Sequence, residues 1–137
     1  MNAVDTNVLL YARDQRDPAK QAVATEFIAS LTDGVLVWQV ACEYIAAGRK
    51  LEPYGFSREH ALQDIQDLRR VWSTILPDWP ALNRANGLMG RFSLSFWDAM
   101  LIAVCLEQGV AALYTEDFDS YRTIDGLRIT NPFREGA

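Results

Sequence analysis

The sequence predicts an α/β fold, in which helices pack on a mostly parallel β-sheet. Short strand-like runs alternate along the chain with longer segments of helical periodicity, which is typical of this class. Strands joined by crossover helices are normally parallel. Half of the 137 residues are hydrophobic and 11% are aromatic, which supplies one ordinary core and excludes a disordered chain. We therefore expect one domain over residues 1–137.

The first half of the chain predicts two strands and three helices. Asp5, Thr6 and Asn7 offer polar side chains that can cap a helix after the first strand. Asp33 and Gly34 end the next helix, and a run of apolar residues then forms a buried strand. The expected elements are a strand at 2–4, a helix through 8–11, a helix at 18–31, a strand at 35–38 and a helix at 40–51.

The second half predicts three more strands. Ser57 begins a helix whose apolar residues recur at helical spacing as far as Val71, and Gly109 ends a strongly apolar helix. The expected elements are a helix from about 57, a strand at 71–76, helices at 81–89 and 96–108, a strand at 110–114 and a short edge strand at 127–129.

The composition limits which molecules and ions the protein is expected to bind. A net charge of −5 argues against a protein that holds nucleic acid by bulk positive charge, although bound metal ions would neutralise the most acidic region of a nuclease. Two distant cysteines, Cys42 and Cys105, and one histidine, His60, are a poor fit to a zinc site. We expect both thiols to be unpaired in the core of a cytoplasmic protein, because the chain lacks a bilayer-spanning apolar run and a secretory signal.

Four acidic residues stand at the ends of predicted elements. Asp5 and Asp117 follow strands directly, whereas Glu43 and Asp98 lie on helices. The carboxyl ends of parallel strands meet at one edge of a sheet, where ligands bind in this fold class. Carboxylates that gather there repel one another unless a cation lies between them, and metal held by carboxylates usually performs phosphate chemistry. The four acids therefore predict a metal site.

Each acid also has an interpretation without metal. Asp5 can cap a helix, and Glu43 can belong to a solvent-facing stripe. The positive end of its own helix can satisfy Asp98, which we expect to be buried because the helix is apolar almost all round. A loop location alone explains the neighbouring acids Glu116 and Asp119.

The motifs in combination resemble a known family. They are Asp-Thr-Asn-Val-Leu-Leu-Tyr-Ala at 5–12, Glu43 after the second strand, Ser-Phe-Trp-Asp-Ala-Met-Leu-Ile-Ala at 95–103, Leu-Tyr-Thr-Glu-Asp-Phe at 113–118 and Asn-Pro-Phe at 131–133. In this order, over nearly the whole length, they resemble a PIN-domain ribonuclease. More narrowly, the chain is similar to the VapC toxin of bacterial VapBC toxin-antitoxin pairs.

The resemblance implies a PIN-like Rossmann-type sandwich, with about five parallel strands and helices on both faces. The residues that it makes catalytic and metal-binding, for Mg²⁺ or Mn²⁺, are Asp5, Glu43, Asp98 and Asp117. Asn7 and Thr115 match groups that orient carboxylates or water. The implied reaction is hydrolysis of a transfer, ribosomal or messenger RNA to a 5′-phosphate and a 3′-hydroxyl. The implied partners are a second copy of the chain and a VapB-type antitoxin that blocks the pocket.

Other classes of function fit the sequence less well or differ in kind. A phosphatase of the haloacid-dehalogenase type needs a second Asp where this chain has Asn7, and the Gly-rich phosphate loop of a nucleotide switch is absent. A catalytically inactive PIN-fold binding or scaffold module is the alternative that a fold alone does not dismiss. If RNA binds, its backbone has as candidate contacts Arg13, Arg16, Lys20, Arg49, Lys50, Arg69, Arg70, Arg91 and Arg122.

Overall fold

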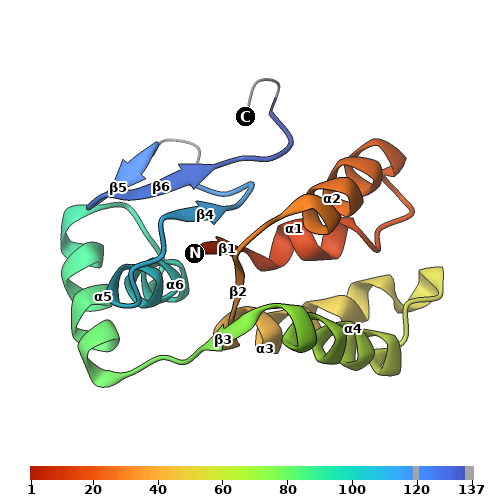
Figure 1. Ribbon diagram of the computed structural model, residues 1–137, viewed down its shortest axis with the longest axis horizontal. Coiled ribbons are helices and arrows are strands. Elements are labelled where there is room, and N and C mark those ends of the chain that lie inside the picture. The colour runs from red at the N-terminus through yellow and green to blue at the C-terminus, as the bar shows by residue number, and fades with distance from the viewer. Residues whose placement is uncertain (119–120, 135–137) are drawn as a thin grey trace.

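A six-stranded sheet forms the centre of the molecule in the computed structural model, which describes residues 1–118 and 121–134 (Figure 1). The strands are β1 Asn2–Val4, β2 Gly34–Val37, β3 Ser73–Ile75, β4 Ala112–Tyr114, β5 Thr123–Ile124 and β6 Leu127–Thr130. Their order across the sheet is β3-β2-β1-β4-β6-β5. All neighbouring pairs are parallel except β5 and β6. The predicted class is therefore confirmed.

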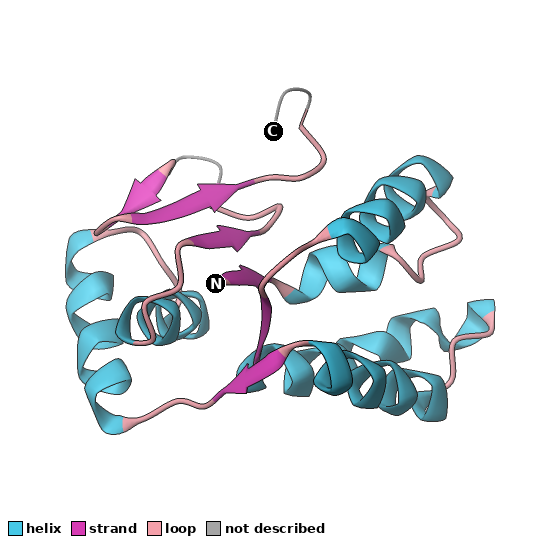
Figure 2. Ribbon diagram, in the orientation of Figure 1, coloured by secondary structure: helices cyan, strands magenta, loops and turns pink. Residues whose placement is uncertain are grey.

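Helices cover both faces of this sheet. They are α1 Thr6–Tyr11, α2 Pro18–Ser30, α3 Trp38–Ala47, α4 Arg58–Val71, α5 Trp79–Arg91 and α6 Phe96–Glu107, with a 3₁₀ helix, η1, at Gly48–Tyr54. Helices α1 to α4 lie on one side, and α5 and α6 pack together on the other (Figures 1 and 2). Right-handed crossovers explain this division, because the chain first moves outward from β1 to β3 and then returns past β1 to β4.

The core lies on both faces of the sheet, and on one of them it includes helix α6, whose residues from Ala99 to Cys105 are all buried. The four residues of β2 are also buried throughout, as expected for a central parallel strand covered on both faces. Packing leaves no room for a side chain at Gly34, where an added Cβ would lie 2.5 Å from Nε1 of Trp72. None of the described helices is long and apolar enough to cross a membrane.

The prediction of about five strands missed the sixth. Strand β5 forms a hairpin with β6, and Asp125 and Gly126 connect them with φ angles of 51° and 92°. Two successive positive φ angles are the geometry of a tight hairpin turn, for which Asp-Gly is a favoured sequence. The signal was present in the sequence, but the two-residue strand was too short to show a period.

Two predicted strand boundaries were wrong by one or two residues. Trp38 was placed in a strand, but it opens α3 and is 51% exposed. Val71 was placed at the start of the third strand, but it is the last residue of α4. In both places an apolar side chain faces solvent, so hydrophobicity alone assigned it to the wrong element.

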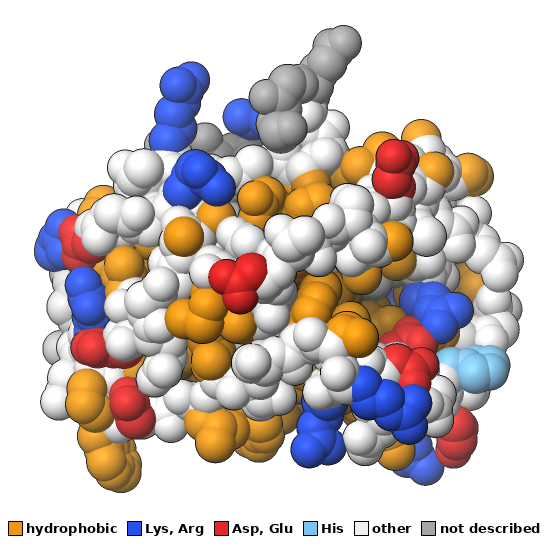
Figure 3. Space-filling model, viewed as in Figure 1, with side chains coloured by type: hydrophobic (Ala, Val, Ile, Leu, Met, Phe, Trp, Pro, Cys, Tyr) orange, Lys and Arg blue, Asp and Glu red, His pale blue; other side chains and the backbone are white. Residues whose placement is uncertain are grey.

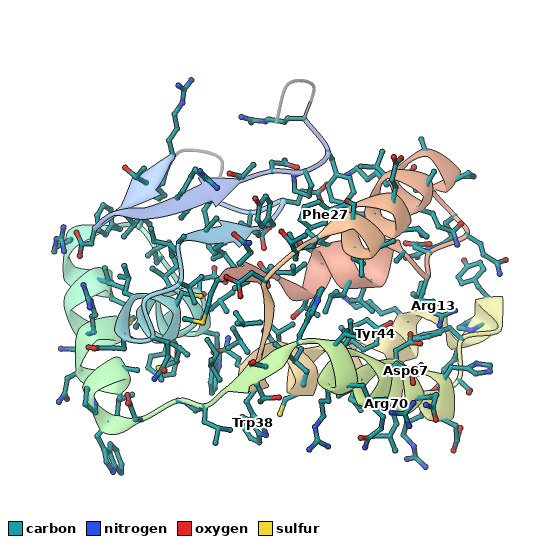
Figure 4. All side chains as sticks on the ribbon, in the orientation of Figure 1. Arg13, Phe27, Trp38, Tyr44, Asp67 and Arg70 are labelled. Atoms are coloured by element: carbon teal, nitrogen blue, oxygen red, sulfur yellow. The ribbon has the colours of Figure 1, made fainter. Side chains whose placement is uncertain are left out.

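Polar contacts fix α4 on the first side of the sheet. Ser57 caps the helix as predicted: its hydroxyl accepts a hydrogen bond from the backbone N–H of His60, whose Nδ1 accepts in turn from Ser57 N–H. Asp64 then accepts hydrogen bonds from the Tyr44 hydroxyl at 2.6 Å and from Arg13 Nε at 2.9 Å. Arg13 and Tyr44 (Figure 4) therefore connect the segment after α1 and helix α3 to α4.

The two cysteines occupy different environments. Cys105 is buried in α6 and its thiol is free, as predicted. Cys42 is also free but exposed, so its assignment to the core was wrong. It faces outward because Val40 and Tyr44, two positions before and after it on α3, face the core.

Candidate active site

Two of the predicted acids follow neighbouring parallel strands. Asp5 comes directly after β1, and Asp117 lies three residues after β4. Val4 pairs with Tyr114 in the sheet, and the backbone N–H of Asp5 extends the ladder by donating to the Tyr114 carbonyl at 2.8 Å. The two segments therefore leave the sheet side by side. This is the position where the crossovers diverge, at which ligands bind in open α/β sheets.

The other two acids come from helices on opposite faces of the sheet. Glu43 lies in the second turn of α3 and is partly buried. Asp98 lies in the first turn of α6, whose N-cap Ser95 accepts a hydrogen bond from the Asp98 backbone N–H. Asp98 is half-buried rather than buried as predicted, because the first turn of α6 emerges from the core with Trp97 62% exposed.

All four acids line one cavity of about 240 Å³. We call it the acidic cavity; its lining residues are Asp5, Thr6, Asn7, Leu10, Gln39, Glu43, Ala47, Asp98, Leu101 and Asp117. Thr115 lies just beneath it and is fully buried. The structure thus brings together residues that are more than a hundred positions apart in the sequence.

Asp5 is the most enclosed of these carboxylates, with 7% of its surface exposed. Its Oδ1 accepts from the backbone N–H of Thr6 at 2.7 Å, and its Oδ2 accepts from the Thr115 hydroxyl at 2.8 Å. Burial, with a smaller contribution from the charges of Asp117 and Glu43, raises the pKa of Asp5 to about 6 against the effect of these hydrogen bonds.

Asn7 and Thr115 contact the carboxylates directly. Asn7 Nδ2 donates to Asp117 Oδ2 at 3.1 Å, and the Thr115 hydroxyl accepts from the Asp117 backbone N–H at 3.0 Å while it donates to Asp5. These contacts fix how the two aspartates are oriented. They are the contacts that the predicted orienting role requires.

Thr6 and Gln39 are two polar neighbours that the sequence prediction did not include. Thr6 Oγ1 donates to Glu43 Oε1 at 3.2 Å, and Gln39 Nε2 donates to the backbone carbonyl of Trp97 at 2.9 Å. Burial raises the pKa of Glu43, hydrogen bonds from Thr6 and Gln39 lower it, and the charge of Asp98 raises it. Gln39 was detectable, because residues four apart share one face of a helix.

The neighbouring acid Glu116 is not the ordinary loop residue that was expected. Its carboxylate forms an ion pair with Lys20 and accepts a hydrogen bond from the Tyr11 hydroxyl at 2.9 Å. These partners lie on α2 and at the end of α1, and Glu116 does not line the acidic cavity. Asp119, the other acid assigned to the loop, lies outside the described residues.

The donor set of the acidic cavity fits a hard divalent cation. Its charged ligands are all carboxylates, the preferred donors of Mg²⁺ and Mn²⁺. Burial is the main cause of the raised pKa values of Asp5 and Glu43, and repulsion from neighbouring carboxylates adds to it; a cation would offset that repulsion. Within 1–118 and 121–134, however, no three acidic, cysteine or histidine side chains stand close enough together to ligate one ion.

A larger apolar hollow adjoins the acidic cavity. We call it the aromatic hollow: it measures about 870 Å³ and shares Gln39 and Glu43 with the acidic cavity. Its other lining residues are Trp38, Cys42, Ala46, Pro77, Asp78, Trp79, Leu82, Phe96, Trp97 and Met100. Hydrophobic side chains gather along the lower edge of the face shown in Figure 3, and Trp38 is labelled there in Figure 4.

Comparison with solved structures finds the same fold in bacterial proteins. A toxin-antitoxin complex from Klebsiella pneumoniae has a TM-score of 0.73 at 15% identity, covering 98% of this chain and 100% of that chain. Mycobacterium tuberculosis VapC20, described as a sarcin-ricin loop cleaving toxin, has a TM-score of 0.71 at 20% identity, with 93% and 99% covered. VapBC-1 from nontypeable Haemophilus influenzae has a TM-score of 0.66 at 15% identity, with 97% and 98% covered.

Comparison of the amino-acid sequence itself tests family membership more directly than comparison of folds. Curated protein sequences give no match to the chain. The family model of the PIN domain matches residues 3–126, which span the segments carrying Asp5, Glu43, Asp98 and Asp117. This match covers most of the chain, and its fold agrees with that of the solved structures. The chain therefore belongs to the PIN domain family.

Proposed function

We propose that this protein is a metal-dependent endoribonuclease and the toxin of a type II toxin-antitoxin pair. One observation carries the proposal: carboxylates from four separate segments, Asp5, Glu43, Asp98 and Asp117, line one cavity at the carboxyl edge of the sheet. Membership of the PIN domain family supports a nuclease, and nucleases of this family generally use divalent metal ions.

In this proposal the four carboxylates hold Mg²⁺ or Mn²⁺. When bound, such an ion makes a water molecule more acidic and stabilises negative charge on the departing oxygen of a phosphodiester. The protein supplies position: Thr115 and Thr6 N–H hold the Asp5 carboxylate, and Asn7 holds that of Asp117. Fixed orientation matters because most of the acceleration in phosphate hydrolysis comes from positioning and charge neutralisation.

The proposed substrate is RNA, cut to leave a 5′-phosphate and a 3′-hydroxyl. VapC20 of Mycobacterium tuberculosis is described as cleaving the sarcin-ricin loop, which supports an RNA substrate for a chain of the same fold. Transfer, ribosomal and messenger RNA are the classes to be distinguished. The proposed protein partners are a cognate VapB-type antitoxin and a second copy of the chain. Similar folds occur in toxin-antitoxin complexes from Klebsiella pneumoniae and Haemophilus influenzae, which supports the antitoxin.

The proposal predicts that the purified protein cleaves total RNA into discrete fragments with Mg²⁺ or Mn²⁺ and not with EDTA. Asp5→Asn, Glu43→Gln and Asp98→Asn should each lower the rate by about 100-fold or more, and Asp117→Asn by about 10-fold, because ligands and their supports affect activity on this scale. The measurement is fragment formation on a sequencing gel against time.

Asp67→Asn is the matched control, since Asp67 is an exposed acid on α4 that does not line the acidic cavity (Figure 4). It should cleave at the wild-type rate. Wild-type rates in all four cavity variants would reject these residues as the site. Absence of cleavage by the unaltered protein with every RNA class and both ions would favour the inactive binding or scaffold module instead.

A further inference from the structure

Glu116 stands between Thr115 and Asp117, in the segment that carries the most exposed acid of the cavity. Its side chain points away from that cavity and is anchored on both carboxylate oxygens. Oε1 accepts from the Tyr11 hydroxyl at 2.9 Å, and Oε2 pairs with Lys20 Nζ. The anchor is partly shielded, because the side chains of Lys20 and Glu116 are only 33% and 28% exposed.

The cation of this anchor is itself held in place by aromatic rings. Lys20 Nζ donates to the Tyr11 hydroxyl at 3.3 Å and lies 4.5 Å from the centroid of the Tyr11 ring and 5.3 Å from that of Phe133. The two rings pack edge to face with centroids 5.0 Å apart. Lys20 is therefore constrained from three sides, unlike a surface lysine that swings freely.

The backbone on either side of Glu116 is held as well. The N–H of Glu116 donates to Asn7 Oδ1 at 3.4 Å, and the N–H of Asp117 donates to Thr115 Oγ1 at 3.0 Å. The next residue, Phe118, has φ = 64°, a left-handed conformation that non-glycine residues adopt only when their surroundings impose it. The turn thus needs restraints, and the Glu116 side chain provides one in addition to Asn7.

From this geometry we infer that Glu116 is a positioning residue: anchored by Tyr11 and Lys20, it sets the turn that presents Asp117 to the acidic cavity. The anchor also keeps a fifth carboxylate out of that cavity. The inference rests on the proposed function, since it assigns Glu116 a part in forming the same metal site.

The test compares Mn²⁺ affinity, measured by titration calorimetry without RNA, and kcat and KM for RNA cleavage. Glu116→Ala removes the anchor and should weaken Mn²⁺ binding and kcat by roughly 3- to 10-fold, with KM changed by less than about 2-fold. Glu116→Gln keeps an acceptor for the Tyr11 hydroxyl and should recover part of the loss. Glu107→Ala is the matched control, because Glu107 pairs with Arg84 at 3.8 Å with similar exposure, away from the cavity; it should change neither quantity.

A second comparison separates positioning from general destabilisation. If Glu116 acts through Asp117, Glu116→Ala should cost less than about 2-fold more in an Asp117→Asn background, because the two changes remove the same contribution. The positioning role would be overturned if Glu116→Ala lowered Mn²⁺ affinity and kcat equally in both backgrounds, or if it had no more effect than Glu107→Ala. Either result would leave the proposed function standing. A wild-type protein that neither binds Mn²⁺ nor cleaves RNA would overturn the proposed function, and the inference with it.

Discussion

The Asp5 carboxylate caps helix α1 and lines the acidic cavity at the same time. Oδ1 accepts from Thr6 N–H, and Oδ2 is held by Thr115. The two interpretations of Asp5 that the sequence allows are therefore compatible, because a carboxylate has two oxygens and each meets one demand. Its burial makes the ionised form costly, which is unusual for a cap and typical of functional sites.

Asp5 should make the metal-free protein less stable as pH rises. Its pKa is raised from 3.8 in the unfolded chain to about 6, so the folded state keeps a proton that the unfolded state has lost. The stability that this proton confers is present below pH 3.8 and is lost as pH rises through 6, by up to about 3 kcal/mol. Asp5→Asn does not titrate, so its unfolding free energy relative to wild type should increase between pH 4 and pH 7.

Urea unfolding in EDTA at several pH values measures this difference. Other carboxylates oppose the trend in wild type, since the pKa values of Asp14 and Asp125 are lowered by arginine partners, but they cancel when variant and wild type are subtracted. Asp67→Asn provides the reference for an exposed acid. A difference between Asp5→Asn and wild type that is flat from pH 4 to pH 7 would refute the assigned shift.

At the same scale, sequence reasoning found the acids and missed some of their neighbours. Asp5 and Asp117 were recognisable because Asp5 follows an apolar strand directly and Asp117 lies three residues after another. Gln39 could have been found, because it lies one turn before Glu43 on α3, but Thr6 could not, because a threonine on a helix gives no signal until its partner carboxylate is placed in three dimensions. Glu116 was misjudged for the same reason: Lys20 lies 96 positions away.

Alanine substitutions at two glycines test how closely the helices and strands pack. Gly34→Ala should destabilise the protein by about 1–3 kcal/mol, because the new Cβ would overlap the Trp72 indole at 2.5 Å where β2 meets the end of α4. Gly87→Ala is the matched change in α5, where nothing lies within 4 Å. It should stabilise by about 0.5–1 kcal/mol, because alanine favours helix. Chemical denaturation of both variants checks the pair; equal effects of one sign would contradict it.

Element order was predictable, whereas some boundaries and the last hairpin were not. Long segments with a clear period, such as α4 and α6, were placed within a residue or two. Trp38 and Val71 failed because exposed apolar residues imitate buried ones in sequence. Strand β5 failed because two residues carry no alternation, although its Asp-Gly turn was visible.

At the scale of the molecule, about half of the basic side chains are paired with acids within residues 1–118 and 121–134. Five of the basic residues considered for RNA binding are in ion pairs within the fold: Arg13, Arg16, Lys20, Arg70 and Arg91. Lys and Arg in Figure 3 are interspersed with Asp and Glu and form no continuous band on that face. The net charge of −5 adds no attraction for a polyanion.

RNA cleavage should therefore depend only weakly on ionic strength. If the protein contacts fewer than about four phosphates of a single-stranded RNA, log KM plotted against the logarithm of the salt concentration has a slope below about 3. Measurement of KM between roughly 50 and 200 mM salt, at a fixed Mg²⁺ concentration, tests this. A steeper slope would mean that the arginines leave their carboxylate partners to bind RNA.

The tryptophans of the aromatic hollow allow binding there to be followed by the protein's own fluorescence. Three of the four tryptophans, Trp38, Trp79 and Trp97, line it with 51%, 76% and 62% of their surface exposed, whereas Trp72 is 6% exposed in the core. Indole emission shifts to shorter wavelength when water is removed from around the ring. Binding of any molecule that covers the hollow should thus shift the tryptophan emission of the unlabelled protein to shorter wavelength, while the emission of Trp72 stays constant.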